Sequence, residues 1–303
     1  MNYLKLFRYQ NLIFIALAQV FIKYGLFLPF QIDITLNSFQ FALLVIATLS
    51  IAAGGNVIND IYDVQIDKVN KPDKVIIGKH ITESSANRLF VVLNVIGVGI
   101  GFYLSNVIER PSFAALFIVF SAMLYLYASY LKGILLVGNI VVSFLVAMSL
   151  IIIGLFDLLP AITPQNQAEQ SLVFGVILRY ALFAFSLNLI REIVKDIQDI
   201  NGDKKGGINT LPIAIGRKRT LMVVFALTVL LIVGILTQMY EHLYNQKTLM
   251  LYFLFGIIAP LLFFCAKTWS AAHKKDFKLL SNTLKIVMLI GTCSLMIFQF
   301  VIL

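Results

Sequence analysis

Nine apolar stretches, each long enough to cross a lipid bilayer, constrain this 303-residue chain more than any other feature. A bilayer core about 30 Å thick needs about 20 mostly apolar residues in a helix. Backbone polar groups must be paired inside a bilayer, so only helices and closed barrels can span it. None of the stretches alternates as an outer-membrane strand does. The predicted spans are residues 10–30, 38–58, 88–105, 112–131, 139–159, 171–190, 219–238, 249–267 and 284–303.

The composition supports the same fold class. Charged residues make up 13% and hydrophobic residues 60% of the chain, whereas soluble domains carry about 25% charged residues. Both cysteines, Cys265 and Cys293, fall in predicted spans, so we expect buried side chains and no disulfide. We therefore predict one all-α intramembrane domain, residues 1–303, a polytopic membrane protein in which nine transmembrane helices surround a central cavity.

The distribution of basic residues predicts the orientation. With the N-terminus inside, 20 of the 24 Lys and Arg residues lie in inside segments, and the outside segments carry only Arg110 and Lys247. Because cytoplasmic loops are enriched in Lys and Arg, this bias predicts an N-in, C-out protein of the cell (inner) membrane. It also explains the net charge of +9 without a nucleic-acid partner. Within the spans, we expect Lys23 and Arg179 to snorkel or to pair with acids such as Asp157.

An acidic pattern occurs twice and contains six of the 15 Asp and Glu residues. Each copy holds three aspartates, separated by three and then four residues. The copies lie in the polar segments 59–87 and 191–218, and their aspartates are Asp60, Asp63 and Asp67, then Asp196, Asp199 and Asp203. Four spans separate the two copies, so both are expected on the cytoplasmic face.

Each motif can act as a metal site if it lies at the end of a helix. Its three carboxylates then fall within one sector of the helix, and Asn59, four residues before Asp63, shares that face. Mg²⁺ prefers one or two carboxylates, water and phosphate oxygens, so two facing motifs could hold a diphosphate. The alternative is a set of solvated side chains at helix ends. The repeated spacing on one face of the membrane favours the metal site.

The sequence around both motifs resembles the UbiA-type intramembrane prenyltransferases. The resemblance rests on Asn59-Asp60-x-x-Asp63-x-x-x-Asp67, on Asn70-Lys71-Pro72 and on Asp199-x-x-x-Asp203. It covers essentially the whole chain and implies nine transmembrane helices with the N-terminus inside. It further implies Mg²⁺-dependent transfer of a prenyl group from an isoprenoid diphosphate to a lipophilic acceptor, among the lipids of the membrane.

Within this family, the segment from Arg191 to Asp203 is most similar to the branch that makes digeranylgeranylglyceryl phosphate, an ether-lipid intermediate. Arg8-x-x-Asn11 is similar to that branch too. Lys71 departs from it, because arginine is usual there and lysine offers no bidentate fork. The resemblance implies a geranylgeranyl donor and a glycerol phosphate lipid acceptor. Two alternatives are an aromatic acceptor of quinone biosynthesis and a divalent-cation transporter, although a transporter predicts acids near mid-span.

Carried over to this sequence, the family pattern implies two metal–diphosphate contacts. The predicted ligands are Asn59, Asp63 and Asp67 for one contact and Asp199 and Asp203 for the other, with Asp60 and Asp196 in support. Of these, Asp63, Asp67, Asp199 and Asp203 are the predicted catalytic residues.

The remaining predicted site residues would bind substrate. Tyr127, Tyr130 and Lys132 resemble a family patch near the diphosphate, although an interfacial aromatic belt is an alternative for the tyrosines. Lys71, Lys74 and Lys205 are candidates to stabilise a phosphate, or they follow from the positive-inside bias alone. Arg8, Asn11 and Asn139 are candidates for the acceptor side, and both asparagines could equally satisfy neighbouring backbone.

Overall fold

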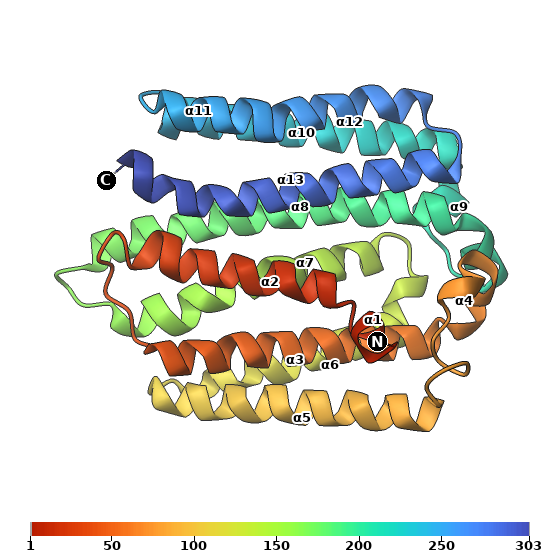
Figure 1. Ribbon diagram of the computed structural model, residues 1–303, viewed down its shortest axis with the longest axis horizontal. Helices are drawn as coiled ribbons and strands as arrows, with labels where there is room; N and C mark the ends of the chain where they lie inside the picture. The colour runs from red at the N-terminus through yellow and green to blue at the C-terminus, as the bar shows by residue number, and fades with distance from the viewer. Residues whose placement is uncertain (1, 303) are drawn as a thin grey trace.

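Long helices running side by side dominate the computed structural model, which describes residues 2–302, with side chains for residues 2–297 (Figure 1). Within these residues nine helical segments are long and apolar enough to cross a membrane, as the sequence predicts. They are Tyr9–Phe27, Ser38–Tyr62, Glu83–Val107, Pro111–Ser129, Val137–Ala161, Gln167–Lys205, Arg217–Leu243, Lys247–Ser270 and Lys274–Ile297. The described residues form no strand beyond a single bridge between Ile77 and Ile81.

The labelled elements subdivide these segments. The long helices are α2 (Tyr9–Ile22), α3 (Ser38–Tyr62), α5 (Glu83–Val107), α6 (Ala114–Ser129), α7 (Val137–Ile153), α8 (Gln167–Lys205), α10 (Arg217–Leu243) and α13 (Lys274–Ile302). One π-helical turn joins α11 (Lys247–Phe253) to α12 (Ala259–Ser270), and similar turns extend α2 and α7. Three short helices, α1 (Asn2–Leu6), α4 (Val64–Asn70) and α9 (Leu211–Ile215), complete the chain.

Polar caps set where the membrane helices begin. At the start of α3 the Asn37 side chain accepts the Gln40 backbone N–H at 2.9 Å, and the Gln40 side chain accepts the Asn37 N–H at 3.0 Å. Thr82 caps α5 in the same way by accepting the Ser85 N–H at 3.2 Å. These bonds satisfy donors that the first turn of a helix leaves unpaired.

Several element boundaries differ from the sequence prediction; α13, for example, begins at Lys274 and not at residue 284. Two of the differences concern the acidic motifs. Helix α8 runs 39 residues to Lys205, well past the predicted end at residue 190, because polar residues that lower the hydropathy still pack as helix. The second acidic motif therefore lies on the last turns of α8. The first motif crosses a kink at Asp63, between α3 and α4, and its helical spacing continues through Asp67 N to Asp63 O at 2.8 Å.

Both acidic motifs lie at one end of the bundle, called here the motif end (right in Figure 1). Helices α1, α4 and α9 gather there, and α13 runs from this end to the opposite one. At the core, α3 packs against α5 and α6, and α8 packs against α7 and α13. Small residues allow this close packing; a Cβ on Gly97 of α5 would lie 2.6 Å from Ile51 of α3.

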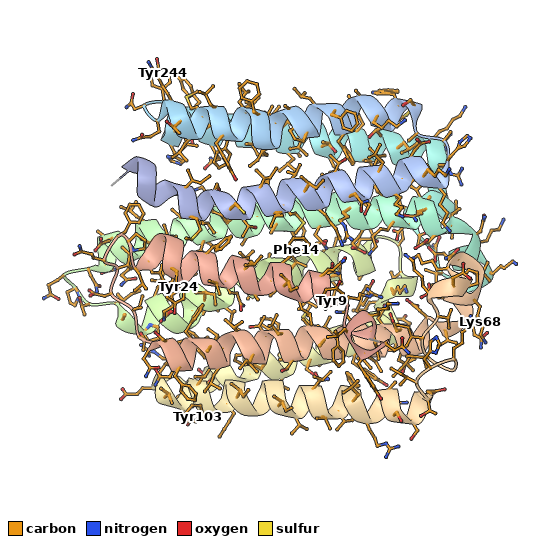
Figure 2. The ribbon with its side chains drawn as sticks, in the orientation of Figure 1. Tyr9, Phe14, Tyr24, Lys68, Tyr103 and Tyr244 are labelled. Carbon is orange, nitrogen blue, oxygen red and sulfur yellow. The ribbon has the colours of Figure 1, made fainter. Side chains whose placement is uncertain are left out.

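The outer surface of the bundle is apolar, as a lipid-facing surface requires. Leu172 and Leu230 are 72% and 68% exposed. Figure 2 shows Tyr24, Tyr103 and Tyr244 toward the end opposite Lys68, and all three tyrosines are exposed. Tyrosine is enriched at membrane–water interfaces, so these residues fit the level of a membrane boundary.

A buried ion pair lies toward that opposite end. Lys23 Nζ donates to Asp157 Oδ2 at 2.9 Å and to the Leu36 carbonyl at 2.6 Å, and both charged side chains are almost fully buried. The Leu36 N–H donates to Asp157 Oδ1 at 2.7 Å, so the pair also anchors the loop before α3. The predicted pairing of Lys23 with Asp157 is confirmed.

Breaking this pair should destabilise the fold. We expect Asp157→Asn to lower the free energy of unfolding by about 3–5 kcal/mol, because Lys23 would remain charged and buried. The double variant Lys23→Met/Asp157→Asn removes both charges and should recover most of that loss. Denaturation in detergent measures the free energy of unfolding of both variants. A single variant as stable as the natural chain would contradict this role.

Candidate functional site

The first acidic motif is held by cations from two other parts of the chain. Arg8, just before α2, pairs with Asp60 at 2.8 Å. Lys132, in the turn between α6 and α7, pairs with Asp63, which also accepts the Asn59 amide at 2.8 Å. Asp60 and Asp63 thus each have a cationic partner from outside the motif.

The second acidic motif forms a stripe along α8. Asp196 accepts the Asn139 amide of α7 at 2.8 Å, and Asp199 pairs with Lys71, which follows α4. Asp203 is buried, with 7% exposed, and has no ion-pair partner among the described residues. Glu192 lies one helical turn before Asp196 and extends this stripe toward the N-terminus of α8.

Lys71 connects the two motifs, because it follows α4 directly and pairs with Asp199 of α8. Lys132, from the turn between α6 and α7, pairs with Asp63 of the first motif. Lys132 also lines a small cavity of about 30 Å³, together with Tyr127, Asn139, Glu192, Asp196, Asp203 and Thr210, among others. Asp196 and Asp203 of the second motif therefore share this cavity with Lys132, and Asp63 of the first motif lies within electrostatic range of Asp203.

A close contact between α4 and α8 fixes this arrangement. Asn70 accepts the Gly202 backbone N–H through its side-chain oxygen at 2.8 Å. The Lys274 ammonium donates to the Asn70 carbonyl at 2.7 Å. A Cβ at position 202 would collide with the Asn70 amide, so glycine is required for this approach. Asn70 precedes Lys71, and Gly202 precedes Asp203, so the contact sets the spacing of the motifs.

Four of the predicted substrate-binding residues lie outside this group. Tyr130 is 67% exposed, and Lys74 lies exposed in the turn Pro72–Lys74. Asn11 is half-buried near the start of α2, with no side-chain hydrogen bond to another described residue. Lys205 lies on a different face of α8 and lines a separate cavity. Its position argues against the predicted contact with the substrate.

The sequence analysis missed a cluster around Glu192. Arg191 and Lys195 pair with Glu192 at 3.2 and 2.8 Å, and Arg8 and Lys285 lie within electrostatic range of it. Glu192 lies four residues before Asp196, so helical periodicity could have placed it on the motif face. Lys285 comes from α13, and no local pattern in the sequence marks it.

Burial and neighbouring charges shift the pKa values on the α4 side. Burial raises the pKa of Asp67, and nearby Lys71 only partly offsets it. Burial opposes the charge of Lys71 as well, but the carboxylate of Asp199 outweighs burial and raises the pKa of that lysine. On this side of the site the Lys71 ammonium, which Asp199 holds, lies near the Asp67 carboxylate, which forms no ion pair with another described residue.

The donor atoms fit a divalent cation that substrate oxygens complete. Asn59 Oδ1 and Asp199 Oδ1 are buried acceptors without a hydrogen-bond partner in the described part of the chain. A buried acceptor without a donor is costly, and a cation would satisfy it. No three His, Cys, Asp or Glu side chains in residues 2–297 gather closely enough to hold a metal by themselves. Mg²⁺ needs few protein ligands when phosphate supplies the others.

Comparison with known proteins identifies the family of this chain. Residues 12–289 match the sequence model of the UbiA prenyltransferase family. The chain belongs to this family. A digeranylgeranylglyceryl phosphate synthase of Sulfolobus acidocaldarius is 36% identical over 72% of this chain and 70% of its own length. One of Methanopyrus kandleri is 40% identical, and that match covers 58% of this chain and 59% of the relative.

Solved structures of low sequence identity share the fold of this UbiA family member. A structure described as digeranylgeranylglyceryl phosphate synthase in membranes has a TM-score of 0.61 at 22% identity, covering 98% of this chain and 97% of that chain. A UbiA homolog from Archaeoglobus fulgidus, bound to DMAPP and Mg²⁺, has a TM-score of 0.60 at 15% identity, covering 98% and 99%.

The α4–α8 contact can be tested at Gly202. We expect Gly202→Ala to lower turnover by about tenfold to a hundredfold, because the methyl group separates Asn70 from α8 and displaces Lys71. The control is Gly99→Ala on α5, where an added Cβ meets nothing within 4 Å. Initial rates in detergent measure both variants. Equal rates for the two would mean that the contact does not position the site.

Proposed function

We propose that this protein transfers a geranylgeranyl group from geranylgeranyl diphosphate to the glycerol phosphate lipid geranylgeranylglyceryl phosphate, forming an ether bond. The observation that carries the proposal is the proximity of the two acidic motifs. Lys71, next to the first motif, pairs with Asp199 of the second, and Lys132, which pairs with Asp63, shares a cavity with Asp196 and Asp203. The names of the relatives from Sulfolobus acidocaldarius and Methanopyrus kandleri support this choice of product.

The diphosphate of the donor would lie between the motifs. Asn59, Asp63 and Asp67 would hold Mg²⁺ on one side, and Asp199 and Asp203 on the other. Bound Mg²⁺ would neutralise the negative charge that develops on the leaving diphosphate. The homolog that binds DMAPP and Mg²⁺ supports this part of the proposal.

Lys71 and Lys132 would bind the donor directly. Lys71 and Lys132 are paired with Asp199 and Asp63, so each can turn from its carboxylate to a phosphate oxygen nearby. When the allylic C–O bond breaks, its electrons go to the diphosphate, and both ammonium groups stabilise that charge. Tyr127 lines the adjoining cavity and would help exclude water from the allylic carbon.

The acceptor would bind toward the cluster around Glu192. Arg191 and Lys195 pair with this one carboxylate, Lys285 lies within electrostatic range of it, and Arg191 Nε is buried without a partner among the described residues. A phosphate dianion balances this surplus charge better than a single carboxylate does. The acceptor hydroxyl would then attack the allylic carbon, lose its proton and form the ether. This charge surplus favours a lipid phosphate over an aromatic acceptor.

The proposed location is the cell membrane, with the active site on the cytoplasmic side. The motif end carries most of the Lys and Arg residues, as cytoplasmic ends of membrane proteins do. Acids gathered at one end of the bundle argue against a divalent-cation transporter, whose site would lie near mid-membrane. At the cytoplasmic face the site is open to the water-soluble head of the donor, while the apolar spans accommodate the prenyl chain.

The acceptor assay tests this function directly. Purified protein with Mg²⁺ and labelled geranylgeranyl diphosphate is offered geranylgeranylglyceryl phosphate in one reaction and aromatic quinone precursors in another. We expect labelled ether lipid only in the first. Arg191→Gln should raise the KM for the acceptor about tenfold and leave the KM for the donor nearly unchanged, because it removes one phosphate contact. Labelled product only with an aromatic acceptor would overturn the lipid assignment.

The carboxylates and the metal give a separate prediction. We expect Asp199→Asn to lower turnover by about a hundredfold or more, since it removes a negative ligand and a partner of Lys71. Asp73→Asn, an exposed carboxylate at the same end, is the matched control and should be fully active. EDTA should stop the reaction of the natural chain, and Mg²⁺ should restore it. Turnover that persists in EDTA would rule out the metal.

A further inference from the structure

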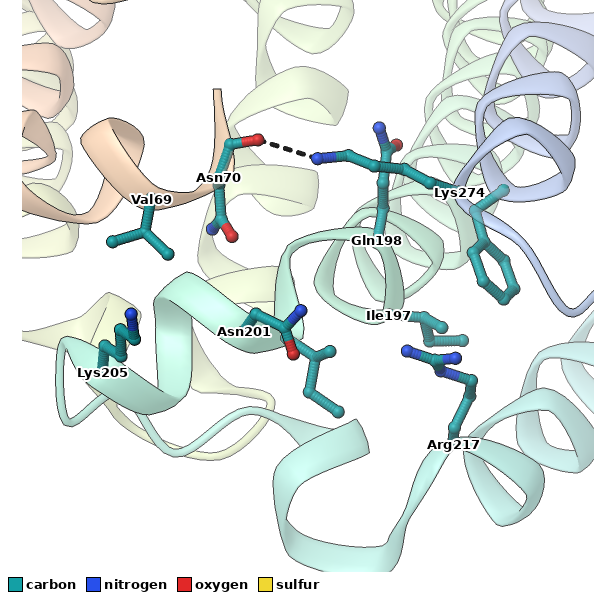
Figure 3. A pocket seen from close by; sticks show the side chains of 10 residues that line it. Val69, Asn70, Ile197, Gln198, Asn201, Lys205, Arg217 and Lys274 are labelled. Carbon is teal, nitrogen blue, oxygen red and sulfur yellow. Dashed lines mark hydrogen bonds between the residues drawn. The ribbon is translucent and has the colours of Figure 1, made fainter. Parts of the chain in front are cut away.

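We propose a second anion-binding site at the motif end, which takes a phosphate group carried by a lipid head group or by a free anion. The site is a cavity of about 350 Å³ on the face of α8 that turns away from the acidic motifs (Figure 3). This size falls in the range of small-ligand pockets. The proposal concerns binding at this cavity and does not depend on the identity of the acceptor.

The charge of the cavity is entirely positive. Lys205 of α8, Arg217 of α10 and Lys274 of α13 line it, and no acidic residue does. None of the three forms an ion pair with a carboxylate of the described chain, whereas Lys267, at the same end, pairs with Asp276. Three cations from three helices that converge without a counter-charge form a site for an anion, and phosphate is the anion that Arg and Lys bind best.

Neutral donors and an apolar base complete the cavity. The amides of Gln198 and Asn201 face it beside the cations, and Ile197 and Phe277 are buried beneath. The Arg217 guanidinium lies 5.7 Å from the centre of the Phe277 ring, which holds it at the rim by a cation–π contact. A polar rim over an apolar base matches a head group joined to a lipid chain.

The positive-inside bias alone would place basic residues at this end. It explains their number, but it does not explain why three of them line one cavity with two amides. The neighbouring Lys204, Lys218 and Lys275 are exposed, as the three cavity cations are, but they do not line the cavity. Lining the cavity therefore depends on the position of the side chain and not only on the basic character of this end.

Asn70 connects this cavity to the catalytic side. Its carbonyl accepts from Lys274, its side chain accepts from Gly202, and the next residue, Lys71, pairs with Asp199. An anion that attracts Lys274 competes with the Asn70 carbonyl for its ammonium group. Occupancy of the cavity is therefore coupled through one residue to the spacing of the acidic motifs.

The test is a ligand titration of the purified full-length protein in a neutral detergent, without donor or acceptor. The probes are short-chain phosphatidylglycerol, short-chain phosphatidylcholine and inorganic phosphate. The readout is the shift of Tm, since a ligand of the folded state raises Tm. We expect phosphatidylglycerol to raise Tm more than phosphatidylcholine. An equal shift with inorganic phosphate would assign the site to a free anion, and a much smaller one would assign it to a lipid head group.

Variants distinguish binding at this cavity from binding at the proposed catalytic site. The variants leave the cations of the catalytic site unchanged. Arg217→Gln/Lys274→Gln should weaken binding about tenfold or more, equivalent to about 1.4 kcal/mol. Lys218→Gln/Lys275→Gln changes the charge equally, one residue away in each segment, and should bind as the natural chain does. If both double variants titrate alike, the proposal is wrong.

A second variant covers the case in which the first does not fold. Asn201→Asp keeps every cation and places a carboxylate inside the cavity, where it should repel the phosphate and abolish the Tm shift. Asn201 makes no side-chain hydrogen bond to another described residue, so the change is structurally mild. Undiminished binding to this variant would also overturn the proposal.

Discussion

The repulsion among carboxylates crowded at one end of a membrane bundle is the constraint on which the candidate site depends. Asp60, Asp63 and Asp199 each pair with a cation from another segment, namely Arg8, Lys132 and Lys71. These ion pairs lower the cost of holding like charges together. They also put a cation beside each motif, at the positions where a phosphate-bearing substrate would need one.

Charge is buried in two different ways in this protein. Lys23 and Asp157 form a closed pair whose remaining hydrogen bonds go to Leu36, so every strong group is satisfied and the pair is structural. At the motif end Asp67 and Asp203 form no ion pair with another described residue, and Asn59 and Asp199 keep oxygens without a partner in the same part of the chain. An unsatisfied polar site is unstable by itself and is stabilised by a ligand.

Helix α8 has two polar faces on its last turns. One face carries Glu192, Asp196 and Asp203 toward α7 and the turn that holds Lys132, and the other carries Gln198, Asn201 and Lys205 toward a basic cavity. The contact between Asn70 and Gly202 lies between the two faces. A helix that is polar on opposite sides at a membrane boundary can respond to ligands on both.

The sequence by itself determined the number of membrane helices and the doubled acidic motif, because span length and helical spacing are local properties that hydropathy and periodicity record. The sequence did not predict the end of α8, because a polar helix end has the hydropathy of a loop. It also could not distinguish Lys205 from Lys71. Only the packing of α4, α8 and α13 decided which lysine meets a carboxylate, and it brought Lys285 near Glu192. Long-range contacts between helices leave no spacing pattern in a single chain.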